Sequence, residues 1–303
     1  MSELIIGLFS SMLALCVPLL IAAEGEVFVE HSGQFNMGIE GMMMLGALSA
    51  FAVTIVTKST PLGLLAGALT GGVLAAAMFL LIYKVHLDLV VVAIVFNLLA
   101  TGITGFLSTL FIGSSRVPKQ CEKIVDIAIP LLSKIPVVGP VLFARNYMVY
   151  AALVCVPVVA RVLFRTRFGL ELRAVGSHKL AASTMGINVL RTQFKCFGIG
   201  GLTGGLAGAY MSLTLGMFVE NMTMNKGFIA LALCTFSRGN PYGTLIGALL
   251  FTLADSLQLR LQLFDFSIPY EFLLMLPYAL TIVVLAAAAR QGRFKKAFYG
   301  RNR

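Results

Sequence analysis

The strongest constraint on this 303-residue chain is a succession of apolar runs, most of them close to the length that crosses a bilayer as a helix, about 20 residues. Charged residues make up only 12% of the chain and hydrophobic residues 58%, whereas a soluble domain carries roughly 25% charged residues. The sequence therefore predicts an all-α, polytopic membrane protein with a single transmembrane domain over residues 1–303. About nine crossings are expected, at 4–23, 38–57, 62–82, 89–112, 146–163, 194–215, 218–236, 242–259 and 269–289. The seventh has a polar first half and is expected to be bent or partly re-entrant.

Basic residues orient these crossings. Seven Lys and Arg lie within 161–195 and six within the tail 290–303, and none precedes Lys58. Because basic residues near membrane spans favour the cytoplasmic side, we expect 165–193 and 290–303 to be cytoplasmic and the N-terminus to lie outside. The loop 113–145 is then extracytoplasmic, although its five basic residues fit that side imperfectly. The net charge of +10 is thus a topology signal and no indication of nucleic-acid binding.

The cytoplasmic segment has the marks of a short helix. Ser177 is predicted to cap its N-terminus and Gly186 to end it in a left-handed conformation. Asn188 is predicted to cap the next helix, which returns into the membrane. Two interpretations of the segment remain open: a docking helix for a motor subunit, or a solvated linker that turns the chain round.

An internal repeat supports the crossing count. The pattern P-x-G-x-L-x-G-A-L at 61–69 recurs at 241–249, and an Asn-x-Gly precedes each copy, at Asn36 and at Asn225. Five crossings separate the copies, so the two point in opposite directions, as in the inverted repeats of transporters. Chance similarity between helices rich in Gly, Ala and Leu is the alternative.

Four polar residues in or near the spans are candidates for lining a translocation path: Asn36, Glu40, Asn97 and Asn221. An acid at membrane depth is costly unless it is paired or faces water, so Glu40 either binds a polar group of the solute or hydrogen-bonds between helices. The three amides have the same two interpretations.

Other polar and small residues predict structure rather than chemistry. Asp255 and Arg260 form a plausible pair near one helix end, and the glycines at 200, 204 and 208 favour either close helix packing or a helix that lines the path. The sequence shows no metal-ligand spacing and no nucleophile with a base. It also has no GxxxxGK[ST] phosphate loop, so this chain is not expected to be an enzyme.

Three segments carry a family resemblance: GQFNMGIEGMMMLGA at 33–47, RTRFGLELRAVGSHKLAASTMGI at 165–187 and GFIALALCTFSRGNPYGTLIGALLF at 227–251. They resemble the permease subunits of bacterial ABC importers, in the branch that serves simple sugars, branched-chain amino acids and purine nucleosides. The patterns NxGxEGxMxLGA and RAVG…AA…GI are most similar to the nucleoside-type permeases linked to basic membrane proteins. Ser177-His178-Lys179 and Ser237-Arg238-Gly239 depart from the common pattern.

The resemblance implies a type II-like permease of the bacterial inner membrane that works as a pair, more often of two different chains. It implies two ATPase subunits that carry ATP and Mg, no cofactor on this chain, and an extracytoplasmic substrate-binding lipoprotein. The segment that would couple to the ATPase comprises Gly176, Ser177, His178, Lys179, Leu180, Ala181, Ala182, Met185, Gly186 and Ile187.

Within that segment, the small Ala181 and Ala182 leave room for a partner surface, and Leu180 and Met185 add apolar contacts. A charge at Ala182 is therefore expected to sit on the docked surface and to uncouple transport.

For the substrate, the resemblance favours purine nucleosides, with riboflavin or a simple sugar as alternatives. The alternative from a different class is an ion-coupled secondary transporter that works through Glu40, Asp255 or Glu271.

Overall fold

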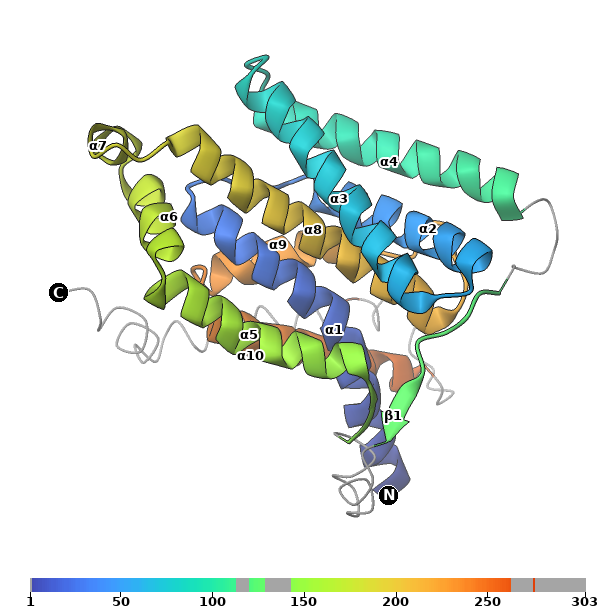
Figure 1. The fold of residues 1–303 in the computed structure, drawn as a ribbon. Coiled ribbons are helices and arrows are strands. Elements are labelled where there is room, and N and C mark those ends of the chain that lie inside the picture. Colours follow the sequence, from blue (N-terminus) through green and yellow to red (C-terminus); the bar gives the residue numbers. More distant parts are fainter. Residues whose placement is uncertain (1, 113–119, 129–142, 263–274, 276–303) are drawn as a thin grey trace.

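The computed structural model describes residues 2–112, 120–128, 143–262 and 275, and the described part is a bundle of helices (Figure 1). Six described helices are long and apolar enough to cross a membrane, so the prediction of an all-helical, multi-pass protein is confirmed. The elements, in chain order, are α1 (Ser2–His31), α2 (Ile39–Thr57), α3 (Thr60–Tyr83), α4 (Leu89–Ile112), β1 (Asp126–Ala128), β2 (Ala144–Asn146), α5 (Tyr147–Arg165), α6 (Arg167–Ser177), α7 (Lys179–Thr184), α8 (Val189–Leu215), α9 (Lys226–Phe236) and α10 (Pro241–Leu261).

Helix α8 is the central helix, in contact with α1, α2 and α3. Its glycines make this possible, because a Cβ on Gly208 would overlap the carbonyl oxygen of Met43 on α2, and one on Gly205 would overlap that of Gly67 on α3. In a bilayer, where apolar surfaces gain little from meeting each other, such close backbone approach supplies the packing energy. Gly205 and Gly208 are both buried, which agrees with the packing interpretation of the glycine stripe.

The predicted helix boundaries agree best with the structure for helices that contain few polar residues. Helix α4 spans the predicted residues 89–112. The first crossing was predicted to end at residue 23, with a polar connector after it, and this is wrong: α1 continues to His31 and buries Glu24 and Glu26. Helix α8 starts at Val189, five residues before the predicted 194, because the side chain of Asn188 caps it there.

Two non-helical stretches interrupt the bundle; we call residues 32–38 the first break and residues 216–225 the second break. The first separates α1 from α2, and the second separates α8 from α9. The second break turns through left-handed conformations at Gly216, Asn221, Met224 and Asn225. Because of it, the predicted element at 218–236 is helical only from Lys226, and α9 is about 16 Å long, roughly half of a 30 Å hydrocarbon core.

The two breaks are followed by the same series of elements. The first is followed by α2, a turn and α3, and the second by the half-length α9, a turn and α10. Both α3 and α10 have a proline in the first turn, Pro61 and Pro241. A Cβ on Gly63 would touch Leu213, so α3 starts beside the end of α8. Gly239 lies against the His31 ring, so α10 starts beside the end of α1. Since α1 and α8 run antiparallel, α3 and α10 start at opposite ends of the bundle (Figure 1).

Only part of the predicted loop 113–145 is among the described residues. The N–H groups of Cys121 and Ile124 donate to Gly216 and Leu213 at the end of α8, and β1 pairs antiparallel with β2. The predicted crossing at 269–289 and the basic tail 290–303 lie outside the described residues.

Candidate translocation site and coupling segment

Glu40, on the first turn of α2, ties α2 to the start of α9. Its carboxylate accepts hydrogen bonds from the Thr223 hydroxyl and from the backbone N–H groups of Asn225 (3.0 Å) and Gly227 (2.7 Å). A helix N-terminus carries unpaired N–H groups and partial positive charge, so a buried carboxylate is stabilised there. Glu40 is only 4% exposed. Its contacts therefore fit the alternative of a hydrogen bond between helices rather than a side chain open to solute.

Asn36 and Asn97 hold the first break from two sides. The Asn36 amide donates to Glu26 on α1 at 2.9 Å. The Asn97 amide, on α4, donates to the carbonyl oxygen of Met37 and accepts from the N–H of Gly41, both at 2.9 Å. The buried Asn36 and Glu40 and the partly buried Asn97 thus gather where α2 begins.

Asn221 lies on the second break and differs from the other three candidates. It is exposed, has a φ of 55°, and its carbonyl oxygen accepts from the N–H of Met224 within a turn. The structure thus assigns it a turn rather than a place in the polar cluster around Glu40.

Sequence reasoning missed three acids on α1 because it placed them in a connector outside the membrane. Glu24 is fully buried, and neither of its carboxylate oxygens has a partner among the described residues. Glu30 accepts from the Cys234 thiol on α9 at 2.9 Å. Glu26 and Glu30 are four residues apart, so in a helix their side chains lie on the same face. This spacing is the sequence signal that could have found them.

Asp255 does not pair with Arg260, as predicted, but with Lys226 at the start of α9, at 3.8 Å. The Arg260 guanidinium instead lies against Gly7 near the start of α1. Asp255 pairs with Lys226 because the second break brings the start of α9 back beside α10.

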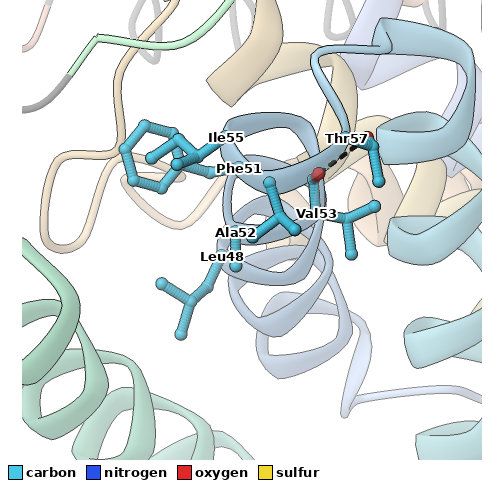
Figure 2. Close-up of a pocket in the computed structure, with 7 residues that line it drawn as sticks. Leu48, Phe51, Ala52, Val53, Ile55 and Thr57 are labelled. Atoms are coloured by element: carbon cyan, nitrogen blue, oxygen red, sulfur yellow. Dashed lines mark hydrogen bonds between the residues drawn. The ribbon is translucent and has the colours of Figure 1, made fainter.

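A hollow along the C-terminal half of α2 is lined by Leu48, Phe51, Ala52, Val53, Ile55, Val56 and Thr57 (Figure 2). The Thr57 hydroxyl donates to the carbonyl oxygen of Val53 at 2.8 Å, so it is already engaged. Solute sites combine an apolar lining with a few polar groups that fix orientation. Since the lining has no uncommitted polar side chain, the hollow does not suit a polar solute.

The segment predicted to be cytoplasmic forms two helices rather than one. Thr166 caps α6 by accepting from the N–H of Gly169, and α6 continues through Ser177. The prediction that Ser177 caps the short helix is therefore wrong; His178 holds that position, and its side chain makes no capping hydrogen bond. The left-handed Gly186 (φ 83°) and the cap at Asn188, which accepts from the N–H of Arg191, are confirmed.

Helix α7 presents apolar side chains to the outside. Leu180 is 85% exposed and Met185 82% exposed, and Ala181 beside them is exposed too. Ala182, which was predicted to sit on the docking surface, is only 4% exposed and packs within this chain. The surface of α7 available to a partner is therefore the face of Leu180 and Met185.

The predicted coupling segment touches the first break directly. A Cβ on Gly176 would overlap the carbonyl oxygen of His31, and Gly33 lies against the same glycine with a φ of 71°. The Gln193 amide on α8 donates to the carbonyl oxygen of Ser32 at 3.1 Å. A displacement of α6 would therefore reach residues 31–33 without an intermediate element.

The six candidate spans among the described helices define a multi-pass membrane protein. The family model described as the permease component of branched-chain amino acid transport systems matches residues 8–285, and the chain belongs to that family.

Curated relatives agree with this assignment. The guanosine ABC transporter permease protein NupQ of Bacillus subtilis is 35% identical over 90% of this chain and 89% of its own length. The nucleoside ABC transporter permease protein NupC of Lactococcus lactis is 36% identical over 91% and 90%. A Haloferax volcanii protein provisionally named a glucose ABC transporter permease, TsgC13, is 37% identical over 84% and 78%.

A solved structure shares the fold. It is an inward-facing conformation of a transporter provisionally classed as metal-chelate type, with a TM-score of 0.54 and 18% identity over 92% of this chain and 85% of that one.

Proposed function

We propose that this chain is the membrane-spanning permease subunit of an ABC importer for purine nucleosides. The observation that carries the proposal is the similarity, at 35% and 36% identity over about nine-tenths of each chain, to permeases named for guanosine and for nucleosides. ATP and Mg then act on separate ATPase subunits, and this chain supplies the path.

Simple sugars are the second candidate substrate class, because the relative named for glucose is 37% identical. An ion-coupled mechanism through Glu40 is disfavoured, since its carboxylate is hydrogen-bonded to the start of α9. At Asp255 the neighbouring Lys226 already balances the charge that a transported cation would have to supply. Glu271, the third acid of that alternative, lies outside the described residues.

The finer architecture of the proposal is nine crossings with an inverted repeat, α1–α2–α3 against α8–α9–α10. Two features support it: each set places a break after its first helix and a proline at the start of its last, and the last helices start at opposite ends of the bundle. Half-helices that begin inside the membrane, as α9 does, are typical of such transporters.

For coupling, we infer that residues 176–187 dock on an ATPase subunit through Leu180 and Met185. Exposed large apolar side chains on a short helix mark an interaction site when no lipid covers them. The contact between Gly176 and His31 gives docking a physical route to the first break, where Asn36, Glu40 and Asn97 lie.

The complete importer would hold a second permease, two ATPase subunits and an extracytoplasmic binding lipoprotein, in the inner membrane of a bacterium. The exposed apolar side of α4, which includes Val91, Leu98 and Phe106, would face lipid or the second permease.

Substrate identity is tested by expressing the chain with its partner subunits in a host that lacks nucleoside uptake. Labelled guanosine should enter, and unlabelled inosine or adenosine should compete while glucose and riboflavin should not. Competition by glucose alone would replace nucleosides by sugars.

Orientation is tested by cysteines at two exposed ends of the bundle, Lys58→Cys and His178→Cys. An impermeant thiol reagent applied to intact cells should label the first and spare the second. Labelling of both from outside would contradict the proposed orientation.

A further inference from the structure

The Lys226–Asp255 ion pair lies deep in the bundle. Helix α9 begins at Lys226 and ends at Phe236. The turn after Phe236 packs on His31, at the end of the bundle where α7 lies. At about 1.5 Å per residue, Lys226 is about 15 Å from that end, near the middle of a 30 Å core. By the same measure Asp255 is about 21 Å along α10 from Pro241.

Neither member of the pair is sealed inside the protein. The Lys226 side chain is 17% exposed and the Asp255 side chain 22% exposed. Charged side chains at membrane depth face the protein interior or water, because exposure to lipid is costly. Helix α4 shows the contrast: its outward face carries Val, Leu, Ile and Phe, and α4 has no charged residue. The edge at Lys226 is therefore expected to face water or protein rather than lipid.

The polar groups at this edge keep hydrogen-bonding capacity. The ion-pair distance of 3.8 Å exceeds the 2.7–2.9 Å of a direct charge-assisted hydrogen bond, so the two charged groups do not use up each other's hydrogen-bonding capacity. Asn225 is exposed in a left-handed conformation, and its side chain makes no capping hydrogen bond at α9. Glu40 caps α9 in its place, which leaves the Asn225 amide available.

We propose that Asn225, Lys226 and Asp255 line the water-filled path and contact the solute. None of the three was among the path-lining candidates named from the sequence. Resting on the proposed nucleoside import, the assignment gives each group a role. The Asp255 carboxylate accepts from the ribose hydroxyls, and the Lys226 ammonium and Asn225 amide donate to acceptor atoms of the base. Because the two charges cancel, the site suits a neutral, hydroxyl-bearing solute.

Accessibility tests the location without relying on altered transport. Lys226→Cys, in a Cys121→Ser background, is placed in the complete transporter in proteoliposomes and treated with a charged, water-soluble thiol reagent. We expect modification, slowed when guanosine and the binding protein are present. Ile246→Cys, exposed on α10, is the matched control and should stay unmodified in lipid. An unreactive Cys at 226, or one that guanosine does not protect, would overturn the assignment.

Specificity tests the contact itself. The binding protein is the same for all variants, so a change in the ratio of guanosine to 2′,3′-dideoxyguanosine uptake belongs to the permease. In Asp255→Asn this ratio should fall about tenfold, as for the loss of a hydrogen bond to a charged group. The charge exchange Lys226→Asp with Asp255→Lys should assemble and yet import guanosine poorly.

The outcomes separate the two proposals. A ratio unchanged in Asp255→Asn, or uptake restored by the charge exchange, would make the pair structural and overturn the solute contact. If Asp255→Asn fails to assemble, the labelling of Lys226→Cys decides. Failure of the unmodified protein to import guanosine would instead refute the proposed function.

Discussion

The first break and α7 each depart from the usual placement of residues. The first break has polar side chains inside the protein, and α7 has apolar side chains on its surface. Around the first break, charged and amide side chains such as Glu40 and Asn97 lie inside the bundle and bond to backbone groups of neighbouring helices. On α7, Leu180 and Met185 stand outside with more than four-fifths of their surface exposed. The first region makes its contacts within this chain, whereas in the proposed function the second makes its contacts with a partner.

The difference predicts two kinds of mutational effect. A buried hydrogen bond to a charged group contributes about 1.5–3 kcal/mol, and removing one partner leaves the other unsatisfied. Changes around the first break should therefore lower the amount of folded protein. Burying an exposed leucine on docking stabilises a complex by roughly 2 kcal/mol, so changes on α7 should spare folding and weaken coupling.

The largest effect is expected at the tightest interior contact, Gly208→Ala. The added Cβ would overlap the carbonyl oxygen of Met43, and backbone atoms cannot give way. The chain should fail to accumulate in the membrane, at a cost of about 3 kcal/mol or more. Gly198→Ala on the same helix is the control, since nothing lies within 4 Å of its Cβ. Immunoblots of membranes and detergent thermal melts measure both; equal accumulation would contradict close packing of α8.

Glu40→Gln should come next. One amide oxygen cannot replace both carboxylate oxygens, so an N–H of α9 or the Thr223 hydroxyl is left without its acceptor. We expect a loss of about 2–4 kcal/mol, seen as a lower melting temperature and less assembled complex. Normal assembly with reduced transport would instead place Glu40 in the path.

Leu180→Asp should leave folding intact and impair function. A charge on the exposed face of α7 would oppose docking, and we expect ATP hydrolysis stimulated by the loaded binding protein to fall about tenfold, the equivalent of 1.4 kcal/mol. Ser183→Asp, an exposed α7 position without an apolar contact to lose, is the control. Equal stimulation in the two variants would remove α7 from the interface.

Ala182→Asp should have the smallest effect on stimulated ATP hydrolysis per assembled complex. It should lower the amount of assembled complex modestly. Because Ala182 is buried in its own chain, the new carboxylate loses hydration, at a cost of about 1–3 kcal/mol. We expect α7 to shift or fray, with partial loss of stimulation in proportion to lost complex. A loss of stimulation at full complex level would return Ala182 to the docking surface.

Periodicity and hydropathy predicted most of the fold because lipid imposes helices on apolar runs. They failed at the end of α1, where a window over Glu24 and Glu26 is too polar to be assigned to a membrane span. Their burial depends on helices far along the chain, such as α8, whose Thr203 lies against Gly25, and a local window cannot contain such a partner.

The candidate site was predictable in its members and less so in their roles. Asn36, Glu40 and Asn97 were singled out from sequence, and the structure brings all three to the first break. Lys226 was missed because its pairing with Asp255 depends on the second break folding back, which residue spacing does not encode. The wrong cap at Ser177 arose similarly, since α6 continues through it.

The account's central claim is that this chain imports nucleosides with energy received through α7, and energy dependence tests it most directly. The purified chain, its partner permease, ATPase subunits and binding protein are placed in proteoliposomes with the binding protein on one side and ATP on the other. Labelled guanosine should accumulate only with hydrolysable ATP, and the Leu180→Asp complex should bind ATP yet accumulate little. Accumulation driven by a proton or sodium gradient without ATP would contradict the claim.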